Sequence, residues 1–198
     1  MKLFKLRHMI LLAALGLFSY CADKNKSDED IELYTDDKSQ IGIEISDEEL
    51  GIKFNSPKDW ELTPSSLSKK IENRNSPGDG FIYEPIYVFF DKVNGSVLSC
   101  GKVNSTDTLV SKNSEMNFYK GLLSTKYKNS EMYLHSFVNS RVSFTLVRFS
   151  KENLTAYKLF FHNSKQQIVQ LEYSFRKDSA DSVLPAIKAS IGSIRLIN

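Results

Sequence analysis

Cysteine and histidine are scarce in this sequence of 198 residues, which contains two cysteines and three histidines. So few cysteines exclude the disulfide framework on which many small exported domains depend. Cys100 falls inside an apolar run, where a single thiol is expected to behave as a small buried hydrophobe. His135 and His162 fall on separate predicted strands, with no Cys or Glu at ligand spacing. The sequence therefore predicts no metal site.

Signatures of catalysis are also missing. The sequence has no G-x-S-x-G, no H-E-x-x-H, no phosphate-binding loop and no dinucleotide fingerprint. Asp178 and Asp181 lie three residues apart, but they fall at the predicted start of a helix, where acidic side chains cap amides and complement the helix dipole. Basic residues never run beyond two in a row, unlike the basic stripe of a nucleic-acid binder. We expect no enzymatic activity, no cofactor and no nucleic-acid partner.

One unbroken apolar block stands at the N-terminus. Basic residues at positions 2, 5 and 7 precede it, and the block covers residues 9–18. It is about half as long as the roughly 20 residues of a spanning helix, so it favours a cleaved signal peptide over a transmembrane anchor. Ordinary secretion with cleavage near residue 21 and an uncleaved anchor are the alternatives.

The Ser-Tyr-Cys sequence that ends at Cys21 resembles the lipobox of bacterial lipoproteins. Phe18 and Tyr20 depart from that pattern, which usually has Leu and a small residue at these positions. The resemblance implies that residues 1–20 are removed and that Cys21 becomes the acylated first residue. Each buried methylene of an acyl chain would add about 0.8 kcal/mol of membrane affinity. Ala22, in place of the Asp that retains lipoproteins at the inner membrane, favours the outer membrane.

Charge is unevenly distributed along the chain. Residues 22–49 contain eleven acidic and three basic residues, whereas residues 50–198 contain thirteen acidic and twenty basic ones. Few large apolar residues occur between residues 22 and 39, which is typical of a disordered spacer. We therefore expect an acidic flexible tether at residues 21–39 and a globular domain at residues 40–198. A basic domain could face anionic headgroups, lipopolysaccharide or an acidic partner, although its charges are scattered singly.

The first half of the domain is predicted to contain strands and a hairpin. Isoleucines alternate over residues 41–45, which is a strand pattern. Residues 81–93 and 96–103 read as two strands joined at Asn94-Gly95, because Asn-Gly is the preferred pair of a type I′ turn. Residues 63–80 are rich in Pro, Gly, Ser and Asn and predict a long loop.

Two helices and a meander complete the prediction. Asp107 is placed to cap a helix that continues to residue 127. Its apolar stripe consists of Met116, Tyr119, Leu123 and Tyr127. Period-2 patterns over residues 132–175 predict an antiparallel meander with one buried face. A last helix begins near residues 178–182, with Pro185 in its first turn if Ser182 is the cap. The predicted fold class is α+β, an antiparallel β-sheet with helices packed on it.

Three stretches of the chain resemble the PsbP-like family, which includes small bacterial lipoproteins. Residues 51–60, Gly-Ile-Lys-Phe-Asn-Ser-Pro-Lys-Asp-Trp, are similar to the family's opening motif. The Val-Asn-Ser-Arg turn at residues 138–141 and the strand, helix and Ser-Ile-x-Leu ending over residues 157–196 also match. The resemblance implies an α/β/α sandwich and a mainly non-catalytic binding or assembly role. It carries no catalytic or metal motif onto these positions.

Aromatic residues are dense between positions 81 and 90, so some must lie on the second face of the sheet. A helix could cover them, or Tyr83 and Tyr87 could line a ligand groove beside the loop at residues 65–80. The sequence as a whole favours a membrane-anchored lipoprotein that acts as a non-catalytic binding or assembly module with a protein partner in the cell envelope. A surface-exposed adhesin or host-contact lipoprotein is the alternative, followed by a small-ligand binder or an enzyme.

Overall fold

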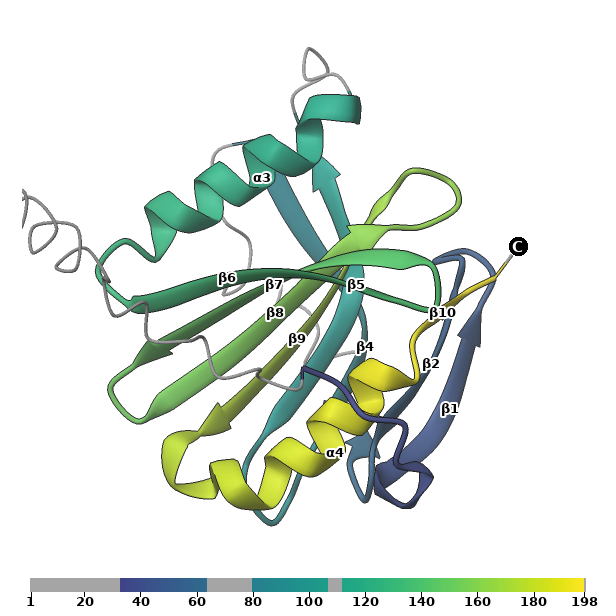
Figure 1. The fold of residues 1–198 in the computed structure, drawn as a ribbon, viewed down its shortest axis with the longest axis vertical. Helices are drawn as coiled ribbons and strands as arrows, with labels where there is room; N and C mark the ends of the chain where they lie inside the picture. The colour runs from purple at the N-terminus through teal and green to yellow at the C-terminus, as the bar shows by residue number, and fades with distance from the viewer. Residues whose placement is uncertain (1–32, 64–79, 107–111, 198) are drawn as a thin grey trace, which may run out of the picture. The chain divides into compact units, whose positions relative to one another are not determined.

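The computed structural model describes residues 33–63, 80–106 and 112–197 (Figure 1). The elements, in chain order, are the 3-10 turn Lys38–Gln40, β1 Ile41–Asp47, β2 Ile52–Pro57, β3 Glu61–Leu62, β4 Phe81–Phe90, β5 Val97–Ser105, α3 Lys112–Lys126, β6 Glu131–Asn139, β7 Val142–Lys151, β8 Leu154–His162, β9 Ile168–Arg176, the 3-10 turn Lys177–Ser179, α4 Ala180–Gly192 and β10 Arg195–Leu196. The predicted signal peptide, Cys21, the loop at residues 64–79 and the Asp107 cap lie outside the described residues.

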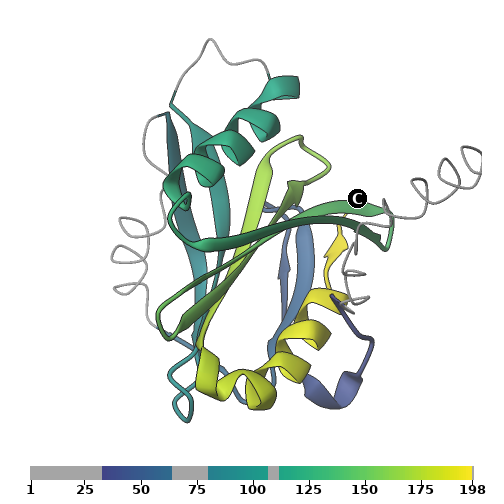
Figure 2. The ribbon, with the colours of Figure 1, turned by 60° about the vertical axis from the view of Figure 1, so that its left-hand side comes forward.

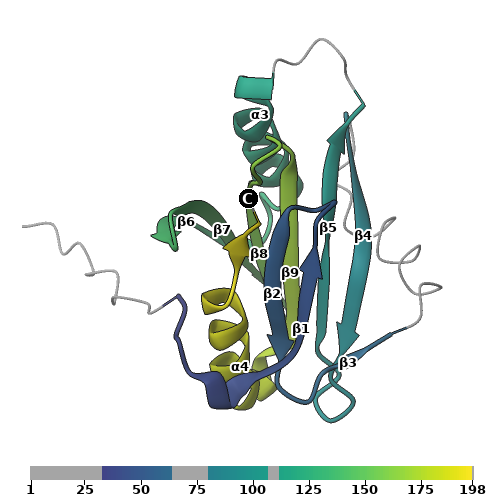
Figure 3. The same cartoon turned by 90° about the vertical axis from the view of Figure 1, so that its right-hand side faces the viewer.

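The strands form two antiparallel sheets. Seven strands are ordered β3-β4-β5-β9-β8-β7-β6, and β1, β2 and β10 make a small second sheet (Figures 1 and 3). The predicted α+β class, with an antiparallel sheet and helices packed on it, is confirmed. The separate small sheet was not predicted. It forms because β2 pairs on one side with β1 and on the other with the C-terminal β10.

Each face of the large sheet carries a buried core over its central strands. On one face, Val147 and Phe160 pack with Tyr119 and Leu123 of α3. On the other, side chains of β5 and β7–β9 pack against α4 and the small sheet. Figure 2 shows the ribbons of α3 and α4 beside the large sheet. The prediction of a single buried face for the meander is therefore wrong. Val147, Lys158 and Phe160, which lie between the positions of the predicted face, are buried beneath α3.

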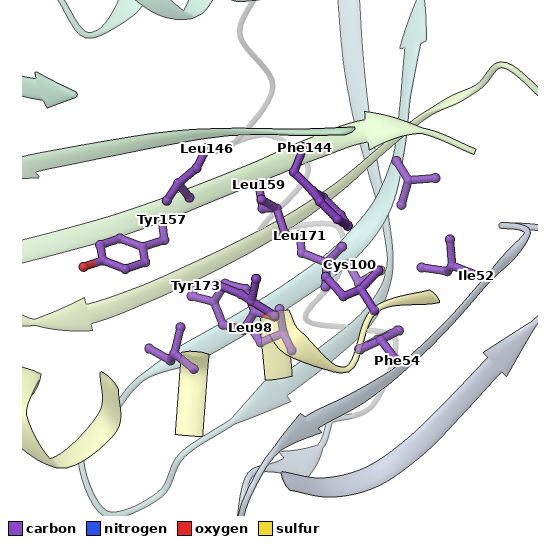
Figure 4. Packing of buried hydrophobic residues seen from close by; sticks show 14 of the residues in the cluster. Ile52, Phe54, Leu98, Cys100, Phe144, Leu146, Tyr157, Leu159, Leu171 and Tyr173 are labelled. Carbon is purple, nitrogen blue, oxygen red and sulfur yellow. The ribbon is translucent and has the colours of Figure 1, made fainter. Parts of the chain in front are cut away.

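The larger core lies between the large sheet, β2 and α4. Leu98, Cys100 and Leu171 of the large sheet point toward Ile52 and Phe54 of β2 (Figure 4). Helix α4 contributes an apolar face to this core, with Val183, Ile187 and Ile191 fully or almost fully buried. Cys100 is fully buried, as predicted, and burial raises the pKa of its thiol well above the usual range.

The hairpin prediction at Asn94-Gly95 is right for the strands but wrong for the turn. The last paired residues are Phe90 and Val97, so six residues connect the strands. Asp91 organises them, because its Oδ1 accepts the backbone N–H of Val93 at 2.9 Å and of Asn94 at 3.2 Å. Of the Asn-Gly pair only the glycine has positive φ, at 70°. The carboxylate therefore replaces the predicted type I′ turn.

A two-residue turn with positive φ at both positions occurs instead between β6 and β7. Ser140 has a φ of 50° and Arg141 a φ of 69°, between the paired residues Asn139 and Val142. This is type I′ geometry without the residues that usually signal it. Its backbone twist matches the strands, and the long β6–β7 ladder holds it in place.

The helices differ from the prediction mainly at their ends. The apolar stripe of α3 is confirmed, with Tyr119 and Leu123 fully buried. Helix α4 follows a 3-10 turn and has Ser179 as its N-cap residue, so Pro185 lies beyond the first turn. The predicted Ser182 cap is therefore wrong. Proline at this position removes the hydrogen bond that would reach the carbonyl of Asp181. Neither α3 nor α4 is long and apolar enough to span a membrane.

Gly121, in the middle of α3, offers a mild stability test. A Cβ placed there meets nothing within 4 Å, and the residue is exposed. Gly121→Ala should raise the free energy of unfolding by about 0.5–1 kcal/mol, because it lowers the chain entropy lost on folding. Urea denaturation would measure the gain as a higher midpoint. Gly95→Ala is the control, since its Cβ is equally unobstructed but its φ of 70° should make the change destabilising. A loss of stability in Gly121→Ala would contradict this account of α3.

Candidate functional site

A cleft lies where the start of the folded unit crosses the end of α4. Its volume is about 400 Å³. It is lined by Thr35, Asp36, Asp37, Lys38, Ile41, Glu44, Lys53, Asn55, Ala189, Gly192, Ser193 and Arg195. The N-terminal segment, the small sheet and the C-terminal turn of α4 thus each contribute one side.

Packing fixes the N-terminal wall of this cleft. Leu33 and Tyr34 pack against the main core, and the Tyr34 ring stacks on Phe137 with 5.6 Å between centroids. The backbone N–H of Thr35 donates to the carbonyl of Lys188 at 3.2 Å. Residues 33–39, which were predicted to belong to the tether, therefore contribute packing to the folded unit.

Gly192 lets this wall approach α4 closely. A Cβ on Gly192 would lie 2.0 Å from the carbonyl oxygen of Thr35, so only glycine fits against the passing backbone. Asp37 ends this wall as the N-cap residue of the 3-10 turn that follows, and its Oδ1 accepts the N–H of Ser39 at 2.9 Å. The hydrogen bonds from Ser39 hold the pKa of the Asp37 carboxyl below its usual value.

Serines of α4 join the opposite wall to β2. The hydroxyl of Ser190 donates to the carbonyl of Asn55 at 2.6 Å, and Ser193 Oγ accepts the N–H of Asn55 at 2.8 Å. Arg195 donates through one guanidinium nitrogen to the carbonyls of Gly192 and Ile194, at 2.5 and 2.7 Å. Its positive charge therefore lies at the C-terminus of α4, where it complements the helix dipole.

The charges of the cleft are balanced. Three acidic side chains face three basic ones, and Glu44 and Lys53 form an exposed ion pair of 2.9 Å on its floor. The residues lining it include no histidine and no cysteine. Across the described parts of the chain, no three His, Cys, Asp or Glu residues gather as metal ligands. The cleft can offer hydrogen bonds and ion pairs of both signs, which suits a polar surface or peptide better than an acyl chain.

A second polar cluster is buried under α3. Lys158 of β8 and Glu172 of β9 form an ion pair of 2.8 Å, and the two residues are 0% and 4% exposed. Beside them, the hydroxyl of Tyr119 donates to Oε1 of Gln170. Burial disfavours the charged form of Lys158, but the Glu172 carboxylate, together with Tyr119 and Tyr127, raises the lysine pKa well above its usual value.

This cluster is held by α3. The Lys158 ammonium lies 5.9 Å from the centre of the Tyr127 ring, which stacks on Phe149. A cavity of about 180 Å³ reaches Glu172 from the end of the helix, with Lys126 and Tyr127 among its walls. Burial raises the pKa of Tyr119 well above the usual range, so its phenol stays protonated as a donor. We interpret the cluster as a structural polar network rather than a reactive one.

The structure does not bring Tyr83 and Tyr87 together. Tyr83 is fully buried on the α3 face, and its hydroxyl donates to Ser99 at 3.1 Å. Tyr87 faces the small sheet, packs edge-on against Phe54 and donates to Asp47 Oδ2 at 2.8 Å. Burial and the Asp47 carboxylate raise the pKa of Tyr87 to about 12. Neither tyrosine lines the 400 Å³ or the 180 Å³ cavity.

A β-bulge separates the two tyrosines. The pairing of β4 with β5 shifts between Pro85 and Tyr87, which reverses the alternation of side chains along β4. His135 and His162 lie on separate strands, as predicted, and burial lowers the pKa of His162. Sequence reasoning missed the cleft itself. The signals present were the apolar pair Leu33-Tyr34 and the serine two positions after Asp37.

No known protein-family model and no curated protein matches the sequence. Among solved structures, the chain is similar to the solution structure of cyanobacterial PsbP (CyanoP) from Synechocystis sp., with 13% identity and a TM-score of 0.49 over 79% of this chain and 93% of that chain. It is also similar to LpqN, which is involved in cell envelope biogenesis of Mycobacterium tuberculosis, with 15% identity and a TM-score of 0.46 over 74% and 83%. The likeness concerns the fold, and we take no function from either structure.

Proposed function

We propose that this protein is a non-catalytic binding or assembly module of the cell envelope, held at the outer membrane by a lipid on Cys21. The observation that carries the proposal is the position of the 400 Å³ cleft. One of its walls is the segment Thr35–Lys38, directly after the point where the preceding chain joins the folded unit at Leu33. Residues 21–32 span at most about 40 Å when fully extended. A partner in the cleft would therefore be held within that distance of the lipid.

The chemistry of the cleft supports a protein partner. Its balanced charges can pair with both signs on a polar protein surface. Elsewhere in the described residues, burial raises the pKa of Cys100, Tyr83 and Tyr173, which keeps these groups protonated and unreactive at neutral pH.

The test is affinity capture from solubilised envelopes with the tagged full-length protein and three variants. Cys21→Ala should leave the membrane fraction yet still bind the partner. Lys53→Glu places a second acid beside Glu44 in the cleft and should weaken capture about tenfold or more. Lys92→Glu is the matched control, because Lys92 and Glu61 form a similarly exposed ion pair of 2.6 Å that does not line the cleft. It should bind normally.

Three results would contradict the proposal. Equal capture by Lys53→Glu and Lys92→Glu would exclude the cleft as the binding site. Capture of no stoichiometric partner by any form would argue against a binding module. Membrane retention of Cys21→Ala would exclude the lipid as the anchor.

A further inference from the structure

Strand β6 is the outermost strand of the large sheet (Figure 3). It pairs with β7 from Glu131 to Asn139 without any register shift, and no strand of the described residues pairs with its other side. An edge of this length presents a row of backbone donors and acceptors to any other extended chain.

The turn that follows β6 shows which backbone groups point outward. A two-residue turn is closed by hydrogen bonds between its flanking residues, here Asn139 and Val142. Because hydrogen-bonded and non-hydrogen-bonded pairs alternate along an antiparallel ladder, the odd-numbered residues of β6 bond to β7. The N–H and C=O groups that face the open edge then belong to four even-numbered residues, Met132, Leu134, Ser136 and Val138.

This edge lacks the usual protection against pairing. From Glu131 to Asn139 there is no lysine, arginine, proline or bulge, and Tyr133, Leu134 and Val138 are 44%, 48% and 64% exposed. The other edges differ, since β3 has only two residues and β1 carries Glu44, Asp47 and an irregular register. Natural proteins block edges by such devices, so their absence on β6 alone is informative.

We propose that β6 pairs with the β6 strand of a second copy, antiparallel and centred on His135. About His135, two of the four residue pairs in Glu-Met-Tyr-Leu-His-Ser-Phe-Val-Asn match by type, one apolar and one aromatic. In this register Met132 lies opposite Val138 and Leu134 opposite Ser136, so the outward backbone groups of both copies meet each other. Tyr133 lies opposite Phe137, an aromatic pair of the kind that stabilises sheets.

The register is selected by length and charge. Centring on His135 pairs all nine residues of both strands, whereas any other centre leaves part of the edge unpaired. It also puts Glu131, the strand's one acidic residue, opposite the neutral Asn139 rather than opposite a second carboxylate. The result is one continuous sheet across two copies of the chain, with the exposed Leu134 and Val138 covered.

A disulfide trap tests the register. In the full chain carrying Cys21→Ala and purified in detergent, His135→Cys should cross-link to itself under mild oxidation. Two residues at the two-fold axis have Cα atoms about 4.5 Å apart, which is within disulfide range. Leu134→Cys is the matched control, because its own copy lies diagonally about 7–8 Å away and should not cross-link alone. A mixture of Leu134→Cys and Ser136→Cys chains should cross-link, because these two residues lie opposite each other in the proposed register. The native Cys100 is fully buried and does not interfere.

Ser136→Pro tests the hydrogen bonds. It removes an outward N–H and leaves the bonds to β7 in place, so the circular dichroism spectrum should be unchanged while dimerisation weakens about thirtyfold in analytical ultracentrifugation. If that variant does not fold, Leu134→Lys places a charge on the same edge and should give monomers. A monomeric parent at tens of micromolar, or self-cross-linking of Leu134→Cys without His135→Cys, would overturn the proposal. Binding of a different polypeptide to this edge in place of a second copy would also overturn it.

Discussion

Replacing Lys158 by methionine should lower the free energy of unfolding by about 3–5 kcal/mol, because the change leaves Glu172 buried without its counter-charge. The two side chains lie 2.8 Å apart beneath α3 and are only 0% and 4% exposed, so little solvent can replace the lost partner. Methionine keeps most of the lysine's length, so the loss should come from the unpaired carboxylate rather than from a cavity. Urea denaturation of the wild type and the variant near pH 7 would measure it.

The double variant Lys158→Met/Glu172→Leu is the control. Replacing both charges by apolar side chains of similar size removes the unpaired charge, and such replacements are often neutral or stabilising. We expect the double variant to regain most of the stability that the single variant loses. If it is as unstable as the single variant, the pair stabilises the fold through packing and not through charge.

The dependence of stability on pH separates the same explanations. In the wild type the pKa of Lys158 is raised, so its contribution is complete below the ordinary lysine pKa and is lost only as pH rises through the higher, strongly alkaline value. Lys158→Met lacks this contribution at every pH. The stability deficit of the variant should therefore be constant below about pH 10 and shrink only in the strongly alkaline range. A deficit that stays constant into that range would contradict this origin.

The same ion pair shows where sequence reasoning succeeds and where it ends. Alternation correctly places Leu159 and Leu171 on one buried face, because a period of two is a property of the strand itself. It assigns Lys158 and Glu172 to the outside by default, since burial of their face depends on α3, an element distant in sequence. Phe160, two residues after Lys158 and therefore on the same face of its strand, was the available sign that the second face is also covered.

The candidate cleft could not be predicted for a related reason. Its walls come from three distant segments, and the segment Thr35–Lys38 is polar enough to resemble a tether. Its place in the fold is decided by Gly192, where the absence of a side chain admits the backbone of Thr35. Turn geometry has a similar limit. Asn94-Gly95 carries the residues of a type I′ turn, but the local Asp91 carboxylate directs the backbone elsewhere.

Gly101→Ala should cost about 3 kcal/mol of folding free energy or more, although it adds one methyl group to a strand. A Cβ at this position would lie 1.9 Å from the carbonyl oxygen of Glu84 and 2.7 Å from the Cα of Pro85. Both obstructing atoms belong to backbone, which cannot rotate away as a flexible side chain would. The collision exists because the β4 bulge presses its chain onto β5 at the Pro85–Gly101 pair.

The bulge and the glycine depend on each other. Proline lacks an N–H and is tolerated where a strand has no partner on one side, and β3 reaches only Phe89 and Phe90 of β4. The bulge beside Pro85 reverses the side-chain alternation, which places Tyr83 under α3 and Tyr87 against the small sheet. Gly101→Ala should therefore lower the urea midpoint and loosen both cores, whereas Gly121→Ala, the same substitution without an obstruction, should raise it. Equal effects of the two substitutions would mean that β4 can move away from β5, and the bulge would then not be what fixes the two tyrosines on opposite faces.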